Sequence, residues 1–102
     1  MSELSSDDFY CPSCGKVPEK NELLLRGYSF VAFHAPYFVC GACGICAYSE
    51  DLLKNAVAAW AKRCDIDQPE LLYPSIASEL EEHLAYFISR GFRRKDFIFK
   101  KK

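Results

Sequence analysis

The chain has 102 residues, of which half are hydrophobic and 15% are aromatic. This length accommodates one domain with a small core, and the hydrophobic content argues against an intrinsically disordered chain. The net charge of −1 argues against strong non-specific binding of the whole chain to nucleic acid. The charge is unevenly spread, because residues 90–102 contain seven Lys or Arg side chains and a single Asp, whereas the rest of the chain is acidic.

Neither end of the chain resembles a targeting or membrane segment. Residues 1–8 are polar and acidic, so we expect a loose N-terminus and not a secretory signal. No apolar run approaches the length of a membrane span. We therefore expect a cytoplasmic protein, and in that reducing compartment Cys-x-x-Cys units are more typical of metal binding than of disulfides.

Two short cysteine units dominate the sequence. Residues 11–15 read Cys-Pro-Ser-Cys-Gly and residues 40–44 read Cys-Gly-Ala-Cys-Gly. Each unit places two thiolates on one tight turn, and the glycine after the second cysteine permits a positive φ there. We expect Cys11, Cys14, Cys40 and Cys43 to bind one structural Zn²⁺ ion. Four thiolates leave no open coordination position, so this site is not expected to be catalytic.

Cys46 introduces two alternatives, because residues 40, 43 and 46 form a cysteine triplet. A shifted ligand pair would use Cys46, but Gly44 follows Cys43 whereas Ala47 follows Cys46, which favours the first pair. An iron–sulfur cluster would require a further cysteine three residues later, and residues 47–50 contain none. We expect Cys46 and Cys64 to be buried or incidental thiols.

The stretch between the two cysteine units predicts a small antiparallel sheet. It is longer than the roughly 15–20 residues of the commonest zinc pattern, so we expect an extended hairpin. Its expected strands are residues 23–25 and 28–33. Pro36 is expected to break the run, and residues 37–40 to form a third strand that leads into the second cysteine unit. This layout is typical of a three-stranded zinc ribbon.

The remainder of the chain predicts two helices, which makes the fold class α+β. The first spans 49–63, with Ser49 as its N-cap and Trp60 anchoring a buried stripe. Residues 65–73 form a connector, and the second helix spans about 74–90 and ends at Gly91. Its expected apolar stripe consists of Ile76, Leu80, Leu84, Phe87 and Ile88. Residues 97–99 form a short terminal strand or an apolar plug. The expected organisation is a flexible N-terminus (1–8), a ribbon with its helix (9–64) and a C-terminal part (65–102) in the same compact unit.

No pattern typical of an active site occurs. The chain has no Gly-rich phosphate loop, no nucleophile elbow and no His-Glu-x-x-His helix. We expect His34 to be a surface or turn residue, and His83 to lie at the edge of the second helix's apolar stripe. These observations predict a protein that is not an enzyme.

Residues 9–63 resemble the Lar-type restriction-alleviation proteins, which are small zinc-ribbon proteins of phages and prophages. The resemblance rests on residues 11–15, on Tyr-Phe-Val-Cys-Gly-Ala-Cys-Gly at 37–44, and on Ala-Val-Ala-Ala-Trp-Ala-Lys-Arg at 56–63. Ala61 stands where that family typically has Asn, and residues 65–102 have no counterpart. The antitoxin-type ribbons share the cysteine units but continue into a helix-turn-helix. The Lar resemblance implies a phage-encoded anti-defence factor that binds a host defence protein.

The sequence leaves three binding modes open. A protein partner would contact exposed aromatic residues near the hairpin tip or the basic C-terminal segment, for which the candidates are Phe33, His34, Tyr37, Arg93, Arg94 and Lys95. Alternatively, the basic tail would bind nucleic acid, making the protein a zinc-ribbon regulator. As a third mode, residues 97–99 would add to the sheet of a second copy and form a homodimer.

Overall fold

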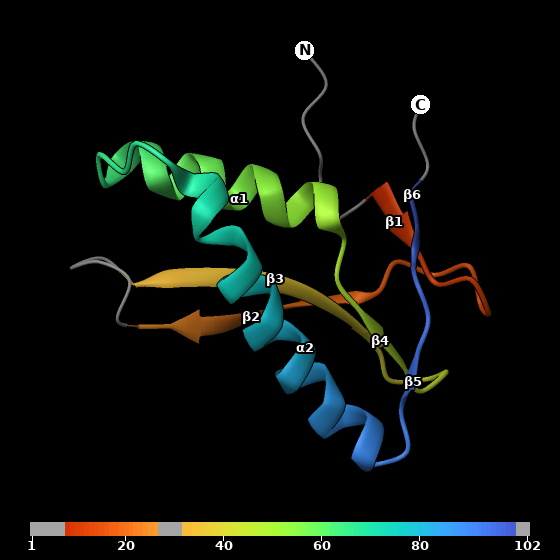
Figure 1. Ribbon diagram of the computed structural model, residues 1–102. Coiled ribbons are helices and arrows are strands. Elements are labelled where there is room, and N and C mark those ends of the chain that lie inside the picture. Colours follow the sequence, from red (N-terminus) through yellow and green to blue (C-terminus); the bar gives the residue numbers. More distant parts are fainter. Residues whose placement is uncertain (1–7, 27–31, 100–102) are drawn as a thin grey trace.

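Strand β3 (Phe33–Cys40) lies at the centre of the fold in the computed structural model, which describes residues 8–26 and 32–99 (Figure 1). It pairs antiparallel with β2 (Glu19–Leu25) along its length and with β4 (Ile45–Ala47) at its C-terminal end. Strand β5 (Arg93–Arg94) pairs parallel to β4, which gives a four-stranded sheet in the order β2-β3-β4-β5. Strands β1 (Phe9–Tyr10) and β6 (Ile98–Phe99) form a separate two-stranded sheet.

Helices α1 (Glu50–Arg63) and α2 (Tyr73–Ser89) pack on one face of the four-stranded sheet. Alternate residues of β3, from Phe33 to Val39, share a core cluster with Trp60 of α1 and Leu80 of α2. Because successive side chains of a strand point to opposite faces, this alternation places both helices on the same side. A short 3-10 helix, η2 (Pro69–Leu71), joins them. The predicted α+β class is confirmed, with a four-stranded sheet in place of the three antiparallel strands expected.

Helix α1 follows its sequence signals. The Ser49 side chain accepts a hydrogen bond from the Leu52 N–H at 3.3 Å, so the predicted N-cap is confirmed. Acidic residues occupy the first turn and basic residues the last, which complements the helix dipole. Trp60 is only 1% exposed and packs against Phe33 with ring centroids 5.2 Å apart, so it anchors the helix to the sheet as expected.

Helix α2 also lies close to its predicted position, but its stripe is narrower. Gly91 has φ 104°, and the Phe92 N–H bonds to the Phe87 carbonyl at 3.1 Å, which closes the helix in a Schellman turn. Ile76, Leu80 and Leu84 are buried, but Ile88 is 44% exposed. The prediction for Ile88 is therefore wrong. The helix still contacts the sheet at this level, because Phe87 packs against Tyr37 and Phe92, and Ile88 lies on the solvent side of the stripe.

The hairpin differs from its prediction at Pro36. Strand β3 runs through this proline without interruption, and Pro36 lies opposite Glu22 of β2. Strand β4 pairs only with residues 38–40, so within the described sheet β3 has a neighbour on one side only at Pro36. A proline on a free edge removes no ladder hydrogen bond, which is why the strand tolerates it. The second predicted strand, 28–33, lies mostly outside the described residues.

The C-terminal segment is integrated into the fold. The predicted terminal strand at 97–99 is present as β6, which pairs with β1 of the same chain. Before it, the Arg93 N–H bonds to the Gly44 carbonyl at 2.8 Å, which places β5 beside the second cysteine unit. Neither helix in the described part of the chain combines the length and apolarity that a membrane crossing requires.

Candidate metal centre

The two cysteine units come together at one end of the four-stranded sheet. Cys11 follows β1, Cys40 ends β3, and Cys14 and Cys43 lie in the turns that come next. The four sulfur atoms all lie within 4.8 Å of one another, and Cys14 Sγ is 3.8 Å from Cys40 Sγ. The two pairs are far apart in the sequence. The antiparallel pairing of β2 with β3, which places Glu19 opposite Val39, brings the turn before β2 and the turn after β3 to the same end of the sheet.

Both turns have the same backbone geometry. The Gly15 N–H bonds to the Cys11 carbonyl and the Gly44 N–H to the Cys40 carbonyl, each at 2.8 Å. Gly15 has φ 74° and Gly44 φ 67°, a conformation in which a side chain is strained. The predicted role of both glycines is confirmed. Each turn directs two thiols toward the same point without help from the other turn.

The cluster is covered on one side only. Cys11 and Cys40 are buried in a small apolar group with Ile45, against which Phe97 packs. Cys14 is exposed and Cys43 half-buried. A metal ion held here would therefore have a protected inner side and an outer side near solvent.

The electrostatics of the four thiols favour a bound cation. Burial opposes ionisation of the Cys11 thiol, but backbone hydrogen bonds from Cys14 and Ser13 outweigh it and lower its pKa to about 7. Hydrogen bonds with Cys14 and Cys11 raise the pKa of Cys43 to about 12. Burial raises the pKa of Cys40. The Cys11 thiolate thus forms more readily than those of Cys40 and Cys43, whose ionisation is opposed by burial and by hydrogen bonds between the thiols; a bound metal cation would favour the thiolate form of all three.

The remaining cysteines lie elsewhere. Cys46 is fully buried in the core cluster under the helices, on the opposite face of β4 from Ile45. Cys64 is half-buried against the same core at the end of α1. Among the described residues, Cys11, Cys14, Cys40 and Cys43 form the only group of three or more His, Cys, Asp or Glu side chains that could hold a metal ion. The shifted-pair and iron–sulfur alternatives, which need Cys46 as a ligand, do not fit this geometry.

The two histidines lie away from the cluster. The His34 side chain is 58% exposed, with Nδ1 3.5 Å from Glu22 Oε1, which agrees with a surface histidine. His83 is half-buried at the edge of the α2 stripe, and its Nε2 lies 2.9 Å from the Tyr37 hydroxyl. The positions expected for both are therefore confirmed.

The candidate partner-binding residues do not form one surface. Phe33 and Tyr37 are 2% and 7% exposed and belong to the core, so the expected aromatic contact patch is not built from them. His34 is exposed beside them on β3 because it points to the other face. Arg93 and Lys95 are exposed, whereas Arg94 is engaged in an ion pair with Glu81 of α2.

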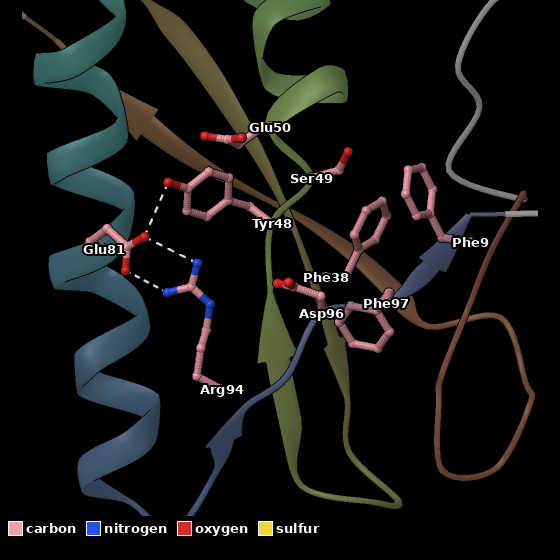
Figure 2. Close-up of a pocket in the computed structure, with 9 residues that line it drawn as sticks. All are labelled: Phe9, Phe38, Tyr48, Ser49, Glu50, Glu81, Arg94, Asp96 and Phe97. Carbon is pink, nitrogen blue, oxygen red and sulfur yellow. Dashed lines mark hydrogen bonds and ion pairs between the residues drawn. The ribbon is translucent and has the colours of Figure 1, made fainter.

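Sequence reasoning missed the polar network around Arg94. Its guanidinium bonds to both carboxylate oxygens of Glu81, and the Tyr48 hydroxyl donates to Glu81 Oε2 at 3.1 Å (Figure 2). These three residues come from β5, α2 and the segment after β4. No local sequence signal marks such a network, because its members are far apart along the chain.

Comparisons of the chain with models of known families, with curated proteins and with solved structures find no match.

Proposed function

We propose that this is a non-enzymatic binding protein whose surface is held in shape by one structural zinc ion. The observation that carries the metal assignment is the 3.8 Å separation of Cys14 Sγ and Cys40 Sγ. Tetrahedral zinc with Zn–S bonds of about 2.3 Å requires S–S separations of about 3.8 Å. An all-thiolate ligand set suits zinc, and four ligands saturate it, so the ion stabilises the fold and the protein surface does the binding.

The proposed setting is a phage or prophage, and the proposed partner is a host defence protein in the cytoplasm. Support comes from the resemblance of residues 9–63 to the Lar-type proteins, in particular from the helix that contains Trp60. Binding would inhibit the defence protein by occlusion, that is, by covering a surface that the defence protein needs for its own activity.

The test is infection of a host that carries a defined restriction system. We expect unmodified phage to form plaques more efficiently on cells that express the wild-type chain than on cells that express Cys14→Ser, which lacks a metal ligand. Cys64→Ser, which lies outside the cluster, is the matched control and should behave as wild type. Equal plating on cells with and without the wild-type chain, across hosts with different restriction systems, would contradict the anti-defence proposal.

The alternative function is nucleic-acid binding through the basic C-terminal segment. It is favoured by the exposure of Arg93 and Lys95 next to the metal cluster, although the body of the protein is acidic. Titration of labelled DNA and RNA at low and moderate salt tests it. Binding that falls steeply with salt and is lost in Arg93→Gln/Lys95→Gln would support this function over protein binding.

A further inference from the structure

A pocket of about 400 Å³ lies between the start of α1, the side of α2 and the segment that joins β5 to β6 (Figure 2). Glu50 enters from α1, Glu81 from α2, and Arg94 and Asp96 from the C-terminal segment. None of these residues belongs to the cysteine cluster. The pocket therefore forms a second candidate site on the described surface.

The polar side of the pocket carries an excess of negative charge. Three carboxylates line it against the single guanidinium of Arg94. Glu81 is already engaged, because its oxygens accept hydrogen bonds from Arg94 and Tyr48. Glu50 and Asp96 are exposed, and among the described residues neither carboxylate takes part in a hydrogen bond or ion pair, although Asp96 interacts electrostatically with Arg94. These two acids are available to a cation from outside.

The opposite side of the pocket is apolar. Phe97 is half-buried and offers accessible apolar surface, whereas Phe9 and Phe38, which are only 3% and 1% exposed, pack with it at ring-centroid distances from Phe38 of 4.9 Å (Phe9) and 5.8 Å (Phe97) (Figure 2). A well-fitting ligand must therefore combine a positive end with an apolar stem. Lysine and arginine side chains have this construction, since three or four methylene groups carry the charged head.

We propose that this pocket binds a lysine or arginine side chain of a partner protein. The methylene stem lies along the phenylalanine side, and the charged head meets Glu50 and Asp96. The pocket opens among exposed residues, which suits a side chain presented by a protein surface. Its volume lies near the lower end of the range of about 300–1,000 Å³ that is typical of ligand pockets. A pocket of this size holds one or two side chains.

Other ligand classes fit the same pocket less well. An anion would approach the N-terminus of α1, but Glu50 and Asp51 occupy that first turn and Ser49 already caps the Leu52 N–H. A bare divalent cation would need several oxygen ligands close together. Among the described residues, no such group is found outside the cysteine cluster.

This inference rests on the proposed function, since it specifies the contact chemistry of a protein-binding surface. The two remain separable. Loss of the plating phenotype in Cys14→Ser tests the zinc-dependent activity. Because Phe97 contacts both the cysteine group and the pocket, the pocket is tested separately by Glu50→Gln/Asp96→Asn, which leaves all four cysteines unchanged. The pocket is tested with defined probes on the purified, zinc-loaded, full-length chain.

The experiment follows backbone amide NMR signals while N-acetyl-arginine methylamide and N-acetyl-lysine methylamide are added. The neutral control is N-acetyl-norleucine methylamide, which keeps the stem and lacks the charge. We expect saturable shifts at residues 48–50 and 96–97 with dissociation constants of about 1 mM or weaker. The neutral probe should bind about fivefold more weakly, which is the scale of two solvent-exposed charge pairs.

The matched variants remove charge without changing side-chain shape. Glu50→Gln/Asp96→Asn should lose the preference for the charged probes, whereas Asp67→Asn/Glu70→Gln, two exposed acids outside the pocket, should keep it.

Equal binding of charged and neutral probes, or no saturable shifts at the lining residues, would overturn the proposal. So would probe binding only in a chain carrying Lys100→Gln, Lys101→Gln and Lys102→Gln, because the protein's own tail would then be the occupant. If Glu50→Gln/Asp96→Asn kept the wild-type plating phenotype, the pocket would not be the contact with the defence protein. The pocket proposal would then be overturned, and the anti-defence function would stand.

Discussion

Arg94 and Glu81 join strand β5 to helix α2. The guanidinium donates to both carboxylate oxygens, with Nη2 3.0 Å from Oε2, and it lies 5.1 Å from the centre of the Tyr48 ring. Strand β5, which carries Arg94, also bonds through Arg93 to the carbonyl of Gly44 in the second cysteine turn. The ion pair therefore helps to hold a strand of only two residues beside the cysteine cluster.

We expect Arg94→Met to lower the free energy of unfolding by about 1 kcal/mol, because the pair is bidentate but partly exposed to solvent. For a domain of this size, that loss lowers the midpoint of thermal unfolding by about 4–8 °C. Arg93→Met, in which the neighbouring exposed side chain is changed, should stay within about 0.5 kcal/mol of wild type. Urea unfolding of the zinc-loaded proteins measures both, and equal losses would show that the pair contributes nothing specific.

The Tyr48 phenol should lose its proton only at unusually high pH. Burial, followed by its hydrogen bond to Glu81, raises its pKa to about 12 from the ordinary value of 10.0. A raised pKa favours the neutral phenol in the folded state. This stabilising contribution is thus complete below pH 10 and is lost as the pH rises from 10 toward 12. Tyrosinate absorbance should show a component near pH 12 that is missing in Tyr48→Phe, and a Tyr48→Phe titration identical in that range would refute the assignment.

Substitution of one metal ligand should remove the metal. Cys14 is exposed, so Cys14→Ser leaves no cavity and changes little except the ligand set. We expect wild-type protein to contain one zinc ion per chain, and Cys14→Ser to have lost stoichiometric zinc and the cooperative unfolding of the ribbon. Cys64→Ser should keep the ion. Metal analysis by mass spectrometry of protein purified without chelator measures this, and zinc-free wild-type protein would defeat the assignment.

The fold should require glycine at position 44 because of the backbone conformation there, and not because a side chain would clash with its neighbours. A Cβ at this position would meet nothing within 4 Å, yet φ is 67°. Gly44→Ala should therefore cost about 1–2 kcal/mol of folding free energy, the strain of a left-handed residue. Gly41→Ala in the same turn also meets nothing within 4 Å and lacks a positive φ. Gly41→Ala should be nearly neutral in urea unfolding, and a similar loss in both variants would contradict the explanation.

Truncation at the two ends of the expected α2 stripe should lower the free energy of unfolding by very different amounts. Leu84 is fully buried, so Leu84→Ala should cost about 2–5 kcal/mol through lost burial and the cavity that remains. Ile88 is 44% exposed, and Ile88→Ala should fall within about 0.5 kcal/mol of wild type. Denaturant unfolding compares the two directly. A large loss in Ile88→Ala would mean that this residue is covered, by the chain itself or by a second copy.

Several features of the fold could be predicted because their causes are local. The cap at Ser49, the stop at Gly91 and the turn geometry at Gly15 and Gly44 each depend on residues within one turn of chain. The position of Trp60 follows from the periodicity of α1, which a helix imposes at short range. These predictions agree with the structure.

The errors have non-local causes. Pro36 was expected to break a strand, and whether it does depends on which side of β3 has a neighbour. Phe33 and Tyr37 were expected at a contact surface, but two helices from later in the chain cover that face of β3. A strand of two residues such as β5 has no periodicity to detect, so its parallel pairing with β4 could not be predicted.

The sequence alone determined the chemistry of the cluster, since cysteine spacing and a following glycine decide how each turn presents its two thiols. Only the tertiary structure decided that the two turns meet, that Arg94 is neutralised by Glu81, and that Glu50 and Asp96 line a pocket beside three phenylalanines. The physical reason is the distance along the chain over which the relevant interactions act. Turn geometry is governed by the torsions of a few adjacent residues, whereas contacts between distant segments depend on how the whole core packs.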